Sequence, residues 1–268
     1  MKAIWARKIF KDMDKKFTQL NQYWRLIIHL SWTEIRSRYA RSVIGPFWLV
    51  LTTAISVMGL SYIWSILFNL DREVFIPSLT VGLVIWQFIA ACVSEAPNCF
   101  TIYGSIMRNY SHPIWIYPTA LVIKNFIIFL HNLVIVIFVL MIYPPDFGWE
   151  TLVIFPAMLL IVVVLTQIAI ILSFLGARYK DFGAAIIALM SIAFFLSPVI
   201  FKPHQLGVKE YLMWFNPFSY LITIIRDPLT GHSSESFVYF VTLFFVFFAS
   251  RIVRLFMKRY GSRVLFWI

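Results

Sequence analysis

The sequence has very little charge for a chain of 268 residues. Lys, Arg, Asp and Glu together make up 13% of it, whereas soluble domains carry about 25%. Hydrophobic residues make up 61%, and no segment between the apolar runs is long enough to fold on its own. A separate soluble catalytic domain is therefore excluded, and we expect one domain embedded in a membrane.

The sequence also lacks the short motifs of common chemistry. It has no G-x-x-x-x-G-K-[ST], which excludes a P-loop for ATP, and no H-E-x-x-H. The five histidines show no metal-ligand spacing. The two cysteines, Cys92 and Cys99, would lie about 10 Å apart on one helix, too far for a disulfide. We predict no catalytic residue, no metal site and no cofactor bound by this chain.

Six long apolar runs are present instead, and a helix needs about 20 apolar residues to cross a bilayer. They predict spans over residues 46–69, 75–103, 115–143, 149–177, 182–201 and 237–257. The expected fold is an all-α integral membrane protein with six transmembrane helices. These helices form a domain of residues 46–268, and residues 1–45 form an N-terminal tail.

The basic residues are distributed unequally between the two faces that these spans define. Eighteen of the 23 Lys and Arg residues lie in the N-terminal tail, the 104–113 and 178–181 loops and the C-terminal segment, and four lie on the other face. Because Lys and Arg accumulate on the cytoplasmic side, we expect both termini in the cytoplasm. The net charge of +11 could suggest nucleic acid, but charge clustered at membrane faces indicates contact with membrane lipid, and we predict no nucleic-acid partner.

The segment from Phe17 to Tyr39 fits neither a span nor a loop. It carries apolar or small residues at helical spacing between basic rims: Phe17, Leu20, Trp24, Ile27, Ser31 and Ile35. This pattern predicts an amphipathic helix on the cytoplasmic membrane surface. A short helix packed against the bundle is an equally good interpretation.

The segment between the fifth and sixth spans, residues 202–235, is too polar to span twice and too apolar for a solvated loop. Asn216-Pro217 breaks it in the middle and Gly231 follows. Two half-helices that enter the outer leaflet, over about residues 203–230, fit this composition, provided that protein shields the irregular backbone. An amphipathic hairpin on the surface is the alternative.

Two ionisable residues lie within predicted spans. Glu95 is near the inner end of the second span, and Lys124 is one to three turns into the third. Such groups are costly in a membrane unless they pair or reach the interface. We predict a structural Glu95–Lys124 pair, because two groups are too few for a proton relay.

Aromatic residues make up 18% of the chain. Several fall within or near the first two spans, where their rings could line a passage and offer flat surfaces to sugars: Trp48, Tyr62, Trp86 and Phe88. Ordinary packing against lipid or protein is the alternative interpretation for each of them.

The order of these elements resembles a known family. The stretch Arg38–Trp48 reads R-Y-A-R-S-V-I-G-P-F-W and is similar to the R-Y-x-x-S-x-L-G-x-x-W stretch of ABC-2 type polysaccharide-export permeases, with Ile44 in place of the usual Leu. A further series resembles the same family in the same order: Ser197-Pro198, Asn216-Pro217, Arg226 and Gly231. The resemblance covers essentially the whole chain and is greatest for permeases of O-antigen (lipopolysaccharide O-polysaccharide) exporters. Permeases of capsule and teichoic-acid exporters are near relatives.

The resemblance implies a homodimer in the bacterial cytoplasmic (inner) membrane, paired with two copies of a separate ATPase subunit that binds ATP and Mg. The implied substrate is a long glycan on undecaprenyl pyrophosphate. It also implies three sets of site residues: an ATPase-coupling helix with Arg108, Asn109, His112 and Pro113; a place where the lipid pyrophosphate enters, with Arg36, Arg38 and Arg41; and an outer gate with Pro198, Asn216, Pro217 and Arg226.

Other interpretations remain open for these residues, and other functions remain open for the chain. The 104–113 segment could be a plain basic loop, and the three arginines equally suit phospholipid headgroups. A membrane-embedded transferase or ligase acting on lipid-linked sugars is a different class of function; the D-x-D of Asp12-Met13-Asp14 gives it little support, because no nucleotide-binding fold follows. A small-molecule efflux permease would share the fold.

Overall fold

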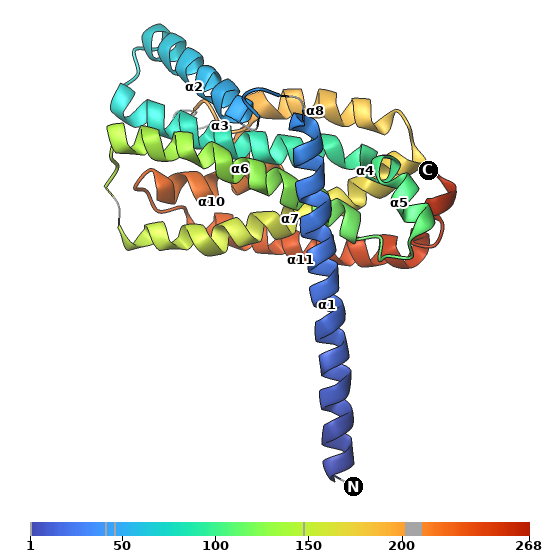
Figure 1. Cartoon of the computed structure of the whole chain (residues 1–268). Coiled ribbons are helices and arrows are strands. Elements are labelled where there is room, and N and C mark those ends of the chain that lie inside the picture. Colours follow the sequence, from blue (N-terminus) through green and yellow to red (C-terminus); the bar gives the residue numbers. More distant parts are fainter. Residues whose placement is uncertain (1, 41, 46, 147, 202–210) are drawn as a thin grey trace.

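The structure, a computed structural model, describes residues 2–40, 42–45, 47–146, 148–201 and 211–268. Within these ranges the regular structure is all helical (Figure 1). The six longest helices are α1 (Lys2–Tyr39), α2 (Phe47–Leu67), α3 (Arg72–Glu95), α6 (Ile116–Ile142), α7 (Ile154–Arg178) and α11 (Ser236–Tyr260). The shorter α-helices are α4 (Cys99–Ile102), α5 (Gly104–Asn109), α8 (Phe182–Leu196), α9 (Tyr211–Trp214) and α10 (Pro217–Leu229). The 3₁₀ turns within the described residues are η1 (Ala96–Asn98), η2 (Trp149–Val153) and η4 (Val264–Phe266).

Among the described residues, five helical segments are long and apolar enough to cross a membrane. They are Phe47–Leu67, Arg72–Ile102, Ile116–Ile142, Thr151–Arg178 and Ser236–Tyr260, and they coincide with five of the six predicted spans. The chain is therefore a multi-pass membrane protein, as the long apolar runs predicted.

The predicted fifth span, residues 182–201, corresponds to a shorter helix. α8 has 15 residues, which is about 22 Å of helix against a hydrocarbon core of about 30 Å. Its end has a local cause, because the residue before a proline is disfavoured in helical conformation. Ser197 precedes Pro198 and is extended, with φ −92° and ψ 147°. The described residues therefore contain five helices of spanning length and the shorter α8, and not the six full-length spans that were predicted.

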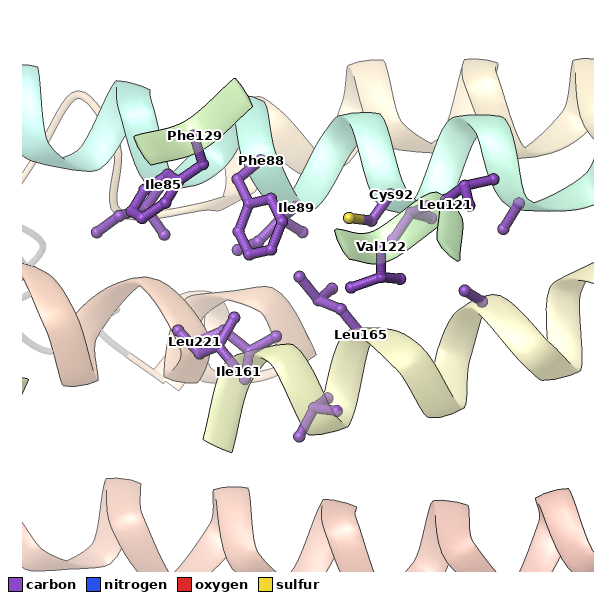
Figure 2. Close-up of a cluster of buried hydrophobic side chains, with 14 of the residues drawn as sticks. Ile85, Phe88, Ile89, Cys92, Leu121, Val122, Phe129, Ile161, Leu165 and Leu221 are labelled. Carbon is purple, nitrogen blue, oxygen red and sulfur yellow. The ribbon is translucent and has the colours of Figure 1, made fainter. Parts of the chain in front are cut away.

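The core of the bundle lies around α3. Figure 2 shows Ile85, Phe88, Ile89 and Cys92 of α3 facing Leu121, Val122 and Phe129 of α6, Ile161 and Leu165 of α7, and Leu221 of α10. α3 also contacts α2 and α8. By contrast, most side chains of α2 are exposed, and α2 lies obliquely at the edge of the bundle in Figure 1. α2 therefore covers only part of α3, and the rest of α3 is covered by α6, α7, α8 and α10.

The end of α3 is held against α7 by a close approach of the two backbones. α3 is interrupted at η1, where Ser173 of α7 donates a hydrogen bond of 2.9 Å to the carbonyl of Ala96. One turn later, a Cβ atom at Gly176 would collide with the backbone carbonyl of Pro97. Only glycine leaves room for this contact between η1 and α7.

α1 crosses the other helices nearly at right angles, and its N-terminal part extends beyond the bundle (Figure 1). It begins at Lys2, well before the predicted start at Phe17. Its C-terminal half packs on α6 through Ile27, Leu30, Ser31 and Ile35, and the Ser31 hydroxyl donates to the Ala120 carbonyl at 2.8 Å. α1 is thus packed against the bundle in this region.

A second row of α1 side chains remains exposed. Leu20, Trp24, Ile28 and Trp32 follow one another at four-residue spacing and are each about half exposed. Leu20 and Trp24 were predicted to share the apolar face of Ile27, but they lie on this separate row. An exposed apolar row on a helix that crosses the bundle suits a position along the membrane surface.

The segment before α11 contains α9 and α10, while residues 202–210 of the predicted re-entrant region lie outside the described residues. α10 packs against α3, α7 and α11. Its residues Leu221, Ile222, Ile224 and Ile225 are almost completely buried. α10 therefore does not lie on the bundle surface, contrary to the alternative of a surface hairpin. Asn216 starts α10 as its N-cap by accepting from the amide of Phe218 at 3.1 Å, and Pro217 occupies the first turn.

Candidate functional site

A cluster of charged side chains lies where α1, α3 and α6 meet, and we call it the polar cluster. Lys124 of α6 is at its centre, with a side chain only 2% exposed. Its Nζ lies 2.5 Å from Glu95 Oε2 of α3 and 2.6 Å from Glu34 Oε1 of α1. The sequence predicted the Glu95–Lys124 pair, and the structure adds a second carboxylate to it.

The remaining members of the polar cluster complete its hydrogen bonding. Tyr103 donates to Glu34 Oε2 at 2.6 Å. Asn125 donates to Glu95 Oε2 at 3.3 Å, and Arg38 Nη2 lies 3.4 Å from Glu95 Oε1. Two carboxylates thus face two cationic groups, so that the formal charges balance. This balance offsets much of the cost of removing charge from water, which an unpaired ion would bear in full.

Glu34 was not predicted, although the sequence contains a signal for it. It lies three residues after Ser31 and seven after Ile27, so helical spacing puts it on the face that α1 buries. A carboxylate on an apolar face needs a cationic partner, and Lys124 was the one lysine predicted within a span. Only residues within predicted spans were considered as partners of Lys124, so Glu34 in the N-terminal tail was missed.

A second polar region lies at the end of the bundle opposite α5, where α8 and α10 meet. Arg226 of α10 is 2% exposed. Its Nη1 donates to the backbone carbonyl of Pro198, which follows α8. Its Nη2 and Nε lie 3.0 and 3.2 Å from Asp227 Oδ1. One guanidinium group thereby connects α10 to the chain that leaves α8.

Asn216 makes the corresponding connection at the other end of α10. Its Nδ2 donates to Ser197 Oγ at 2.7 Å and to the Ala193 carbonyl at 3.1 Å. Three of the four residues predicted as an outer gate, Pro198, Asn216 and Arg226, thus lie in the contact between the end of α8 and α10, and Pro217 follows Asn216 in the first turn of α10. We call this place the α8–α10 junction.

The predicted coupling residues lie at the end of the bundle that carries the C-terminus (Figure 1). Arg108 and Asn109 are the last residues of α5. Arg108 donates to the backbone of Ile268, so the C-terminal residues pack on α5. The ring of His112 stacks on Tyr110, with centroids 5.8 Å apart, and the Pro113 carbonyl accepts from Ile116 at the start of α6. The segment is short, ordered by these contacts and mostly exposed.

The three predicted arginines near the start of the first span have different surroundings. Arg36 is exposed on α1. Arg38 is exposed as well, but pairs with Glu95 of the polar cluster. Arg41 lies outside the described residues. These positions put Arg36 and Arg38 on the C-terminal part of α1, which leads to α2.

Two of the four predicted channel aromatics belong to the core instead. The ring of Trp86 is 7% exposed and contacts Phe194 and Phe218, at centroid distances of 5.7 and 6.1 Å. Phe88 is 4% exposed and packs on Phe126 and Phe129. Both are buried because α3 is enclosed by its neighbours. Neither ring reaches the surface of the single chain in this structure.

Trp48 and Tyr62 of α2 differ from these two rings. They are 46% and 67% exposed, because α2 lies at the edge of the bundle. α2 is linked to α3 and α6 by neutral polar groups that the sequence analysis did not single out. Thr53 donates to Gln87 Oε1 at 2.9 Å, and Asn132 Nδ2 lies 3.4 Å from the same oxygen. Such groups hold helices together in a membrane.

The polar groups described above connect helices to one another and to the backbone. In the part of the chain that the structure describes, no three His, Cys, Asp or Glu residues are grouped to hold a metal ion. The charged groups of the polar cluster are all paired with one another. What the structure contains is a set of inter-helix connections at both ends of a membrane bundle.

Comparison with known proteins agrees with this description. The model of the ABC-2 type transporter family matches residues 25–230. The chain is 22% identical over 218 residues to the O-antigen export system permease protein RfbA of Myxococcus xanthus, an alignment that covers 80% of this chain and 84% of the relative. It is 23% identical over 228 residues to a Klebsiella pneumoniae protein of the same name, covering 82% and 85% of the two chains.

Proposed function

Because this chain belongs to the ABC-2 type transporter family, we propose that it is the permease subunit of an exporter for lipid-linked polysaccharide of the O-antigen type. The observation that carries the proposal is the similarity, over four-fifths of the chain, to proteins named O-antigen export permeases. The five candidate spans agree with a permease. The substrate would be a glycan on undecaprenyl pyrophosphate, moved across the bacterial inner membrane.

The energy for export would come from a separate subunit. The sequence has no P-loop, and two copies of an ATPase subunit would bind ATP and Mg. The segment with Arg108, Asn109, His112 and Pro113 is suited to dock them, because it is short and exposed at one end of the bundle. By the positive-inside distribution of Lys and Arg, this end and both termini would lie in the cytoplasm.

The passage would form between two copies of the chain. Trp86 and Phe88 are packed in the core, whereas α2 exposes Trp48 and Tyr62. Of the four rings predicted to line a passage, these two are exposed and would be available to a sugar chain in a homodimer. Trp86 and Phe88, which are buried in the core, would support the helices that form the wall of the passage.

The two ends of the passage would have distinct residues. Arg36 and Arg38, with Arg41, precede α2 on the proposed cytoplasmic side, and guanidinium groups bind phosphate oxygens in pairs. The α8–α10 junction would close the outer end. Burial of Arg226 and Asn216 between α8 and α10 supports an outer element that protein shields on all sides, as a re-entrant segment requires.

The test is reconstitution of the purified chain into liposomes with lipid-linked O-polysaccharide, with and without the cognate ATPase subunit. We expect ATP-dependent movement of the glycan only when both subunits are present. Movement without any ATPase would overturn the proposal. In cells, deletion of the gene should leave lipid-linked polymer on the cytoplasmic side, whereas accumulation on the outer side would identify a ligase instead.

A further inference from the structure

A cavity of about 360 Å³ opens at the end of the bundle that carries the C-terminus. It lies between the last turns of α7 and α11 and the residues that follow α11. Its walls include Phe174, Phe256, Tyr260 and Trp267, and two arginines, Arg178 and Arg263, also line it. We call it the C-terminal cavity. The function proposed above makes no use of it.

The two arginines of the C-terminal cavity have unused hydrogen-bond donors. Arg178 is held by the ring of Trp267, with its guanidinium carbon 5.4 Å from the ring centre. Among the described residues, neither Arg178 nor Arg263 has a carboxylate within ion-pair distance or a side-chain hydrogen bond to the protein. Arg38 and Arg226, by contrast, each have a carboxylate partner. The cavity therefore offers two unpaired guanidinium groups to an anion.

The walls below these arginines are a continuous series of aromatic rings. Centroids of Phe174 and Phe256 are 5.9 Å apart, those of Phe256 and Tyr260 are 5.6 Å apart, and those of Tyr260 and Trp267 are 5.6 Å apart. A small inorganic anion gains nothing from such walls. An amphiphile does, because its apolar part can lie on the rings while its anionic part meets the arginines.

The position of the C-terminal cavity agrees with an amphiphile from the membrane. Two candidate spans end here, at Arg178 and at Tyr260, which would put the cavity near the boundary between hydrocarbon and water. The carbonyl ends of α7 and α11 repel an anion weakly, and the two guanidinium groups offset that repulsion. Basic pockets between transmembrane helices bind the headgroups of anionic lipids in this way.

We propose that the C-terminal cavity is a binding site for one anionic phospholipid, with its phosphate between Arg178 and Arg263 and its glycerol region on the aromatic wall. The bound lipid would also touch the C-terminal residues, which continue from Trp267 to the contact between Ile268 and Arg108 of α5. An acidic segment of a partner protein could meet the same arginines, but it would leave the aromatic wall unused.

The test measures lipid binding to the purified full-length chain by native mass spectrometry, with phosphatidylglycerol and phosphatidylcholine as probes. We expect phosphatidylglycerol to be retained preferentially, and the double variant R178Q/R263Q to lower its affinity about tenfold. The matched control is R254Q/K258Q, which removes two exposed basic residues of α11 that do not line the cavity. It should change the affinity less than about twofold.

Several results would overturn the proposal. Equal loss in both double variants would indicate a diffuse basic surface, and equal binding of both lipids would exclude selection by charge. Competition by millimolar inorganic phosphate or pyrophosphate as strong as that by phosphatidylglycerol would indicate a site for free anions. Normal lipid binding by R178Q/R263Q combined with failed assembly with the ATPase would identify a protein contact.

Folding of the variants is checked first by thermal unfolding without added lipid. If R178Q/R263Q does not fold, Arg263→Gln alone is used, because the structure gives the Arg263 side chain no partner among the described residues. The readout is then the rise in Tm caused by phosphatidylglycerol, which should be smaller than in the wild type; an equal rise would overturn the proposal. These assays need neither ATPase nor glycan, so their failure is distinct from failure of the proposed export function.

Discussion

The ammonium group of Lys124 lies 2.6 Å from the carboxylate of Glu34, which is 90 residues earlier in the chain. This contact joins α1, which crosses the bundle, to α6 within it. Glu95 holds the other side of the same ammonium group, so α1, α3 and α6 share one buried cation. If α1 moves relative to the bundle, either the Lys124–Glu34 ion pair breaks or α6 moves together with α1.

Replacement of Lys124 tests this arrangement. Lys124→Met leaves Glu34 and Glu95 facing each other without their shared cation, and we expect a loss of about 3 kcal/mol in stability. Thermal unfolding in detergent measures it as a lower Tm. The triple variant E34Q/E95Q/K124M removes the charges together and should recover much of the loss.

The control for this prediction is Lys180→Met, because Lys180 is exposed and has no ion pair in the part of the chain described. It should keep the wild-type Tm within about 2 °C, as for an ordinary surface substitution. If Lys124→Met and Lys180→Met unfold at the same temperature, the polar cluster does not stabilise the fold.

Gly176 should tolerate no side chain. Gly176→Ala puts a Cβ atom against the Pro97 carbonyl, and we expect it to separate α7 from η1 at a cost of about 3 kcal/mol. Gly59→Ala is the matched control, since nothing lies within 4 Å of a Cβ atom there. The Tm values of the two variants, measured side by side, decide the matter, and equal values would contradict the close approach.

Arg226→Lys should weaken the α8–α10 junction although it keeps the charge. Lysine lacks the planar fork that reaches both the Pro198 carbonyl and Asp227. The expected cost is about 1–3 kcal/mol for the unpaired buried acceptor, together with greater ion leak in liposomes if the junction closes the outer end. Arg72→Lys, at an exposed position without an ion pair among the described residues, is the control. If Arg226→Lys shows no greater ion leak and keeps the wild-type Tm, Arg226 neither stabilises the junction nor helps to close it.

Trp86 and Trp48 should differ in what their loss affects. Trp86→Ala removes a ring buried between Phe194 and Phe218 and should cost about 3–5 kcal/mol of stability. Trp48→Ala should leave the Tm nearly unchanged but reduce glycan export, because its ring is exposed on α2. Thermal unfolding and the liposome export assay separate the two effects. Normal export by Trp48→Ala would remove this ring from the proposed passage.

The double variant R108D/H112D should uncouple ATP hydrolysis from export. It reverses the charge of the segment proposed to dock the ATPase, so we expect hydrolysis to continue while export falls at least about tenfold. Both activities are measured in the same proteoliposomes. The control R72D/H232D makes the same changes at the opposite end of the bundle and should export normally. Unchanged export in R108D/H112D would remove the coupling assignment.

Much of the architecture followed from local properties of the sequence. Five of the six predicted spans correspond to helices of spanning length, because hydrophobicity is carried by each segment itself and a helix in lipid must satisfy its own backbone. The start of α10 at Asn216-Pro217 and the end of α8 before Pro198 depend on capping and proline geometry within a few residues. The absence of a P-loop is likewise a property of the chain alone.

The tertiary structure decided which faces of these helices meet. Helical spacing put Glu34 on one face of α1, but only the packing of α1 across α6 made Lys124 its partner. The same packing enclosed Trp86 and Phe88 and left Trp48 and Tyr62 exposed. The sequence does not distinguish these four rings, because all of them lie within or near apolar spans. In a membrane, apolar residues suit lipid and protein equally, so the sequence determined where the chain crosses and packing alone determined which side chains face one another.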